Sequence, residues 1–158
     1  MARMTDIQGS VLTIRPSRYL YELNNIRSSW DENYLRVHVA VVSKSINVEA
    51  SIDMLCADLS DLITWLSLIA TYGNTAAPSF VRYASSSLKF NHMNLPLRRV
   101  DLTAYLAFEL CPEEYRNYED FLYNGYPFTF TLNGSDIVSF TSKLAEEMLA
   151  FPMRKMGG

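Results

Sequence analysis

Few residues in this chain are of the types that carry out catalysis or hold metals. The 158 residues include two histidines, His38 and His92, and two cysteines, Cys56 and Cys111. The cysteines are far apart and lack the close spacing of a metal-binding motif. No glycine-rich phosphate loop, paired-histidine zinc motif or nucleophile-elbow motif occurs in the sequence. We therefore predict no catalytic residues, no metal and no cofactor. An enzyme or small-ligand-binding protein without a readable motif remains an alternative.

Each candidate residue also has an ordinary structural interpretation. His38 lies on the polar side of an alternating strand pattern, where a histidine is usually solvated. His92 shares the phase of apolar neighbours and is expected at the edge of the core. Asp53 and Asp101 occupy polar positions of predicted strands and are expected to serve solubility. For both cysteines we predict reduced, structural thiols, although the sequence leaves a disulfide between them open.

One segment instead has the composition of a binding surface. Between Pro112 and Pro127 the chain holds four acidic residues, one arginine and five aromatic residues. The segment therefore carries a charge of −3, which equals the net charge of the whole chain. Tyrosines offer large rigid faces for recognition, and carboxylates around them favour a basic partner. The sequence predicts a partner-binding site that consists of Glu113, Glu114, Tyr115, Tyr118, Glu119, Asp120 and Tyr123.

The same segment has a structural alternative. Tyr115, Tyr118 and Phe121 have the spacing of one short helical turn that packs on the sheet, with the acidic side chains merely solvated. A long connection between two strands is often functional, and a loop can both pack and bind. The sequence leaves both interpretations open.

The composition indicates the class of protein. Apolar residues make up 49% and charged residues 20% of the chain, as in globular proteins. We predict one domain that spans residues 1–158. The small negative charge and the scattered basic residues argue against nucleic acid as a partner, and no apolar run indicates a signal peptide or a membrane span. The predicted location is the cytoplasm, and the oligomeric state is left open.

Alternation of apolar and polar residues predicts the strands that must position these residues. Helical spacing predicts one helix that begins near Asp58 and stops at Gly73 and Asn74, and a second that Ser135 or Asp136 caps and Pro152 ends. The predicted strands are Val11–Arg15, Tyr19–Leu23, Leu35–Val42, Ile46–Met54, Leu88–Met93, Val100–Leu110 and Phe128–Leu132.

Two stretches look like copies of one strand–helix unit, Asn47–Gly73 and Tyr126–Phe151. When Asp58 is aligned with Asp136, the apolar helix positions coincide. The aligned pairs are Leu59/Ile137, Leu62/Phe140, Leu66/Leu144 and Ala70/Met148. The pattern predicts an α+β fold of two layers, in which an antiparallel sheet carries two amphipathic helices on one face.

The arrangement resembles the WapI-type immunity proteins of bacterial contact-dependent and Rhs polymorphic toxin systems. The likeness is carried by the hairpin that leads into the helix at Ala57–Leu68 and by the closing segment Phe128–Leu144. It runs from Leu35 onward, and Pro112–Pro127 departs from it. The resemblance implies a non-enzymatic inhibitor that binds a cognate toxin domain. The acidic composition of Pro112–Pro127 predicts that it meets a basic surface of that toxin. A dimeric secretion chaperone that wraps an effector segment is the main alternative.

Overall fold

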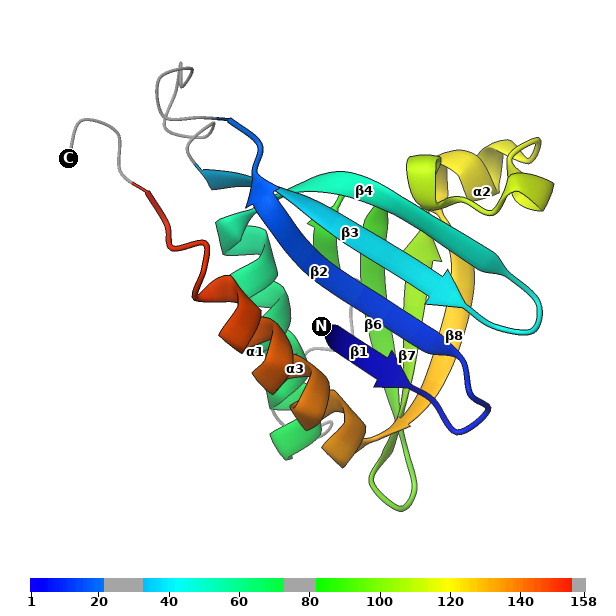
Figure 1. The fold of residues 1–158 in the computed structure, drawn as a ribbon. Helices are drawn as coiled ribbons and strands as arrows, with labels where there is room; N and C mark the ends of the chain where they lie inside the picture. Colours follow the sequence, from blue (N-terminus) through cyan, green and yellow to red (C-terminus); the bar gives the residue numbers. More distant parts are fainter. Residues whose placement is uncertain (22–32, 73–81, 155–158) are drawn as a thin grey trace.

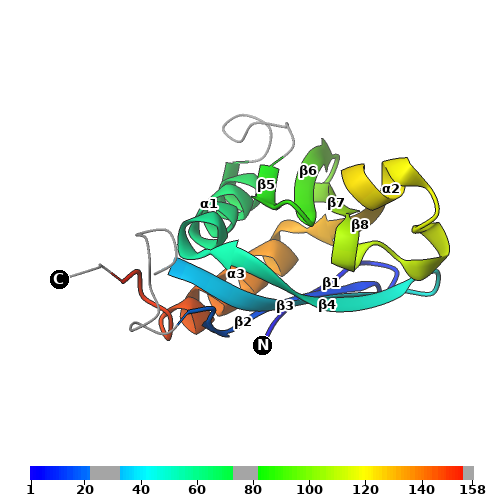
Figure 2. The same cartoon turned by 90° about the horizontal axis from the view of Figure 1, so that it is seen from above.

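The computed structural model describes residues 1–21, 33–72 and 82–154. Its strands form two antiparallel sheets of four strands each, in the orders β1-β2-β3-β4 and β5-β6-β7-β8. Figure 1 shows the first sheet in front of the second, and Figure 2 shows the two as separate layers. The strands are β1 (Ala2–Thr5), β2 (Val11–Tyr19), β3 (Tyr34–Val42), β4 (Asn47–Leu55), β5 (Arg82–Ser85), β6 (Leu88–Leu95), β7 (Arg99–Leu106) and β8 (Tyr126–Asn133).

Two long helices, α1 (Cys56–Tyr72) and α3 (Gly134–Met148), pack against each other beside the sheets (Figure 1). Helix α1 contacts β4 and β5, and α3 contacts β1, β2 and β8. The α+β class with antiparallel strands is thus confirmed. The strands divide into two sheets instead of one, because α1 leads the chain away from the edge strand β4 and a new sheet begins at β5.

Both predicted repeat units fold as a strand that runs directly into a helix. Leu55 ends β4 immediately before α1, and Asn133 ends β8 immediately before α3. Asp58 and Asp136 occupy the same position, the third, of their helices. The first three aligned pairs are buried in both helices, and Ala70 and Met148 are partly buried in both. The alignment of the two units therefore places the same helix face toward the core.

The core is one cluster that includes residues of both sheets and both long helices. Alternate side chains of each inner strand point into it, as the period of two residues requires. Its largest fully buried members include Phe90 and Phe130 from the second sheet, Phe140 from α3 and Leu35 from β3. Removal of these apolar side chains from water makes the main favourable contribution to the free energy of folding.

Several predicted boundaries are wrong for local reasons. Residues 11–15 and 19–23 are not separate strands, because β2 continues through Pro16 with a bulge between Pro16 and Arg18. Strand β7 stops at Leu106 instead of continuing to residue 110, since Phe108 adopts a positive φ of 50° that no regular strand accommodates. Strands β1 and β5 were not predicted.

The helix starts also differ from the prediction. Helix α1 begins at Cys56, two residues before Asp58, which contributes its negative charge within the first turn. In α3 the N-cap is Asn133, and the Asp136 carboxylate accepts a hydrogen bond of 3.0 Å from the Asn133 amide in a capping box. The predicted stop at Gly73 and Asn74 and the end of the strand at Leu23 lie outside the described residues.

Candidate partner-binding site

The connection between β7 and β8 contains three short helices, and the last two lie in the predicted binding segment. The three helices are η4 (Phe108–Leu110), η5 (Glu113–Tyr115) and α2 (Glu119–Asn124). Helix α2 contacts β7 and β8, and η4 contacts β4. Both views show this connection at the opposite end of the sheets from the chain's described C-terminal part (Figures 1 and 2). The segment is therefore a structured projection on the sheet framework.

An aromatic cluster fixes the segment to β8. Tyr115 stacks on Tyr126 with ring centroids 4.3 Å apart, and Phe121 packs edge-on against both rings at 5.6 and 5.4 Å. Burial raises the pKa of the Tyr126 phenol, and a side-chain hydrogen bond between Tyr126 and Tyr115 adds to that rise. Tyr115 is itself half-buried against the core. Of the predicted site residues, Tyr115 thus belongs to the base of the segment.

Two other tyrosines of the segment remain at the surface. Tyr118 is 60% exposed and Tyr123 is 55% exposed. Each still has one supporting ring contact, Tyr118 with Phe121 at 5.9 Å and Tyr123 with Phe108 at 5.8 Å. Their positions are therefore defined while most of each ring stays available to a partner.

All four predicted carboxylates of the segment are exposed. Asp120 accepts a hydrogen bond of 3.3 Å from the Asn124 amide, one turn further along α2. Within the described part of the chain, Glu113, Glu114, Glu119 and Asp120 form no ion pair. Tyr118, Glu119, Asp120 and Phe121 line an open hollow of about 400 Å³. An aromatic wall beside carboxylates suits a Lys or Arg side chain.

The backbone of the segment is held at both ends. The Arg116 guanidinium donates to the carbonyl oxygens of Cys111 and Glu109, each at 3.2 Å. Gly125 has a φ of 102° and passes so close to Tyr105 that a Cβ there would lie 2.7 Å from the Tyr105 Cβ. Only glycine can adopt this positive φ and lie this close to Tyr105 without strain. This pre-organisation reduces the entropy that a partner must overcome on binding.

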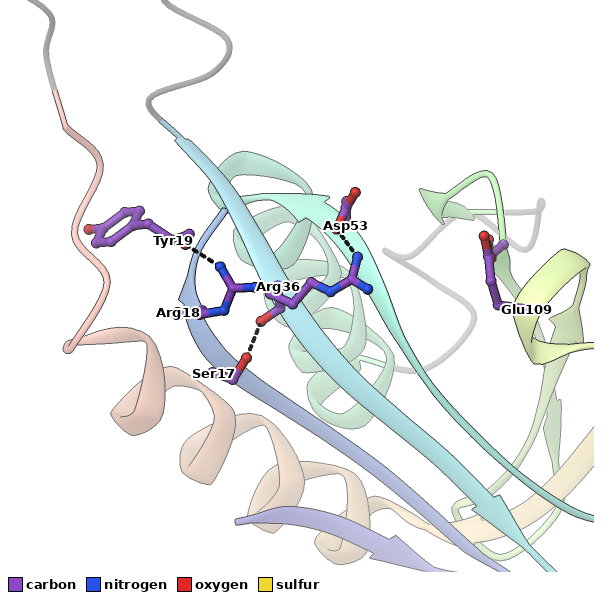
Figure 3. Close-up of polar contacts among 7 residues, drawn as sticks. Ser17, Arg18, Tyr19, Arg36, Asp53 and Glu109 are labelled. Carbon is purple, nitrogen blue, oxygen red and sulfur yellow. Dashed lines mark hydrogen bonds and ion pairs between the residues drawn. The ribbon is translucent and has the colours of Figure 1, made fainter. Parts of the chain in front are cut away.

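The remaining candidate residues do not gather into a second site. His38 lies 3.6 Å from Glu49 on the outer face of the first sheet, where Arg36 also pairs with Asp53 at 2.6 Å (Figure 3). The Asp101 carboxylate accepts a hydrogen bond of 2.7 Å from Thr131 on the second sheet. In residues 1–21, 33–72 and 82–154, no three metal-ligating side chains come together.

His92 and the cysteines are buried. His92 is 4% exposed, in agreement with its predicted place at the core edge, and its ring packs edge-on against Trp65 at 5.4 Å. Burial lowers its pKa because the charged form loses solvation. Cys56 and Cys111 are free thiols. Burial raises the pKa of both, which disfavours the reactive thiolate.

The sequence interpretation missed a second hollow next to the segment. It has a volume of about 440 Å³ and lies between residues 47–49 of β4 and residues Glu109–Arg116, and Glu113 borders it. The alternation of β4 predicts that Glu49 is exposed. The sequence contains no signal that the chain returns to this strand sixty positions later.

Comparison with known proteins places the chain in context. The model of the immunity protein WapI-like family matches residues 3–152. This range includes the N-terminal strands and Pro112–Pro127, so the likeness extends further than the sequence pattern indicated. No curated protein matches the chain. No helix within the described residues is long and apolar enough to cross a membrane.

Proposed function

The chain belongs to the WapI-like immunity protein family, and we propose that it binds one cognate bacterial toxin domain and blocks it without catalysis. The binding is stoichiometric and takes place in the cytoplasm, where the toxin would otherwise act. The observation that carries this proposal is the pair of exposed tyrosines, Tyr118 and Tyr123, in a packed aromatic segment whose four carboxylates form no ion pair with any described residue.

The roles of the seven site residues divide by burial. Tyr118 and Tyr123 contact the toxin and are desolvated by it, as aromatic residues at the centre of interfaces usually are. Glu113, Glu114, Glu119 and Asp120 meet Lys and Arg side chains of the toxin and accelerate encounter. Tyr115 supports the surface from below through its stacking on Tyr126.

The charge of the segment indicates the surface that it covers. Toxins that act on nucleic acids or nucleotides need basic clefts to attract their substrates. A rigid acidic projection that enters such a cleft excludes the substrate by occupying the same basic groups. The association rate should therefore fall steeply as the salt concentration rises, because exposed charges are screened within a Debye length.

The proposal is tested by purifying the tagged protein from its native bacterium and identifying bound proteins by mass spectrometry. Recovery of a large secreted toxin or its C-terminal domain at one-to-one stoichiometry is the expected result. A parallel growth assay, in which that toxin domain is expressed with and without this chain, should show restored growth. Recovery of an effector's N-terminal region by a dimer of the chain would contradict the proposal and favour a secretion chaperone.

A further inference from the structure

Strand β4 is an edge strand with backbone groups that point away from its sheet. It pairs with β3 alone, and the β3–β4 turn is closed by a hydrogen bond of 2.8 Å from the Ser43 amide to the Ile46 carbonyl. Because antiparallel strands alternate between bonded and non-bonded pairs, the pair Val41/Val48 exchanges hydrogen bonds in this register. The amides and carbonyls of Asn47 and Glu49 therefore face outward.

These outward groups are unpaired within the described chain. No backbone hydrogen bond joins Asn47 or Glu49 to an element other than β3 among the described residues. The second hollow, of about 440 Å³, begins at this edge. Its far wall consists of Glu109, Cys111, Glu113 and Arg116, and in Figure 3 Glu109 lies on the other side of β4 from Arg36. An open strand edge thus forms one side of a groove.

The groove is acidic. Glu49, Glu109 and Glu113 contribute three carboxylates. The first of these is 72% exposed and lies 3.6 Å from the His38 ring nitrogen. The one guanidinium in the groove, that of Arg116, donates to the backbone carbonyls of Cys111 and Glu109. Glu109 also accepts a hydrogen bond of 2.6 Å from the Ser87 hydroxyl, which holds its carboxylate in place. The excess negative charge favours a basic occupant.

We propose that this groove binds an extended, lysine- or arginine-containing segment of the toxin as an added strand on β4. The open amides and carbonyls of Asn47 and Glu49 supply two rungs of a ladder, which is how strand addition provides affinity. Alternate side chains of the added strand point toward the carboxylates and give charge specificity. Glu113 borders this groove and belongs to the same predicted partner-binding segment as Tyr118 and Tyr123, so one partner can contact both. The identity of the occupant rests on the proposed function, whereas the strand addition does not.

The test uses the full chain, labelled with ¹⁵N, and a synthetic seven-residue peptide that alternates lysine and valine. The amides of Asn47 and Glu49 should shift and exchange with solvent about 10-fold more slowly when the peptide is bound. The amides of Val48 and Ala50 should change little, because they already bond to β3. A peptide that is N-methylated at alternate residues should bind about 10-fold more weakly, and a glutamate–valine peptide should not bind.

Two variants of the chain distinguish the contribution of the Asn47 backbone amide to peptide binding from that of the Asn47 side chain. Asn47→Pro removes the outward amide at the first residue of an edge strand, where proline is tolerated, and should weaken peptide binding. Asn47→Ala keeps the amide and should bind normally. If Asn47→Pro fails to fold, the methylated peptide still decides the question. Equal binding of both peptides, or shifts confined to Glu113 and α2, would overturn the proposal.

Other outcomes separate this proposal from the immunity function. Concentration-dependent protection of the same amides without peptide would mean that a second copy of the chain occupies the edge, and would overturn it. Recovery of a toxin that Asn47→Pro still binds at full affinity would refute strand addition alone. Binding of the basic peptide to β4 with no toxin recovered from the bacterium would refute the immunity function alone.

Discussion

The Asp6 carboxylate lies 3.4 Å from the amide nitrogen of Thr131 and thereby connects the end of β1 to the edge strand of the other sheet. The Ile7 amide donates to the Thr131 carbonyl at 3.1 Å in the same place. The carboxylate also accepts the amides of Gln8 and Ser10, each at 2.9 Å. One nearly buried side chain therefore holds a turn and joins two sheets.

Replacing Asp6 by Ala should lower the free energy of unfolding by about 1–3 kcal/mol, because three backbone amides lose an acceptor. Asp6→Asn keeps one carbonyl oxygen for the turn and should recover part of the loss. Urea denaturation of Asp6→Ala and Asp6→Asn measures the free energy of unfolding of each variant. Hydrogen exchange at Thr131 should accelerate in Asp6→Ala, and an unchanged rate there would contradict the proposed connection between the sheets.

The chain should unfold as one unit. A single core cluster contains residues of both sheets, and we propose on this basis that residues 1–158 form one domain. Far-ultraviolet circular dichroism and tryptophan fluorescence should then give coincident urea transitions, since small single domains usually unfold in two states. Two separate transitions would show that the sheets unfold independently.

Gly125→Ala should destabilise the protein more than Gly9→Ala. Both glycines have a positive φ, 102° at Gly125 and 87° at Gly9, so alanine is strained at either position. A Cβ at Gly125 would also lie 2.7 Å from the Tyr105 Cβ, whereas nothing lies within 4 Å at Gly9. We expect a loss of about 1 kcal/mol at Gly9 and about 2–4 kcal/mol at Gly125. Equal losses would mean that the segment shifts freely away from Tyr105.

His92 should make the protein less stable in mild acid. Its folded pKa lies below the ordinary value, so the unfolded chain takes up a proton more readily than the folded chain. The contribution of His92 to stability is therefore fully present above the unfolded pKa of about 6.5 and decreases as the pH falls below it. Neither ring nitrogen has a hydrogen-bond partner among residues 1–21, 33–72 and 82–154.

His92→Phe removes this titration and keeps a ring that can pack against Trp65. We expect a stability at pH 7.5 that is equal to or above that of the parent, because a buried polar group without a partner is costly. Between pH 7.5 and 5, the variant should lose less stability than the parent. Melting temperatures measured across this range check the prediction, and parallel curves for the two proteins would contradict it.

Local patterns in the sequence predict the parts of the fold that local physics determines. The two amphipathic helices follow from the spacing of Leu59, Leu62 and Leu66 and of their counterparts, because helical period and burial agree there. Strand β1 offers only Ala2 and Met4 to the core, which is too short a pattern to detect. The division into two sheets depends on the direction that the chain takes after α1. No short stretch of sequence contains this information.

Local sequence patterns also do not predict how the residues of the candidate site are arranged. Composition distinguishes residues 112–127 from the rest of the chain, but the five aromatic residues are alike in sequence. Whether a tyrosine supports the segment or faces solvent depends on its neighbours in space. Tyr115 lies on Tyr126 of β8, whereas Tyr118 and Tyr123 have only edge contacts. The groove beside β4 was missed for a similar reason, because its two walls are distant in sequence.

Replacing both Tyr118 and Tyr123 by Ala should separate binding from stability. Both rings are mostly exposed, so the free energy of unfolding should change by about 0.5 kcal/mol or less for each. If they are hot spots, affinity for the toxin domain should fall by at least ~2 kcal/mol, or about 30-fold. Calorimetric titration of the purified toxin domain measures this loss.

Tyr115→Ala is the matched control, because it removes a tyrosine of the same segment that lies underneath. It should lower stability by about 1–3 kcal/mol through the lost stacking on Tyr126 and lost burial. Its effect on affinity should be smaller than that of the double variant when both proteins are folded. Full affinity in the folded double variant would place the interface elsewhere, and the β4 groove would then be the next surface to test.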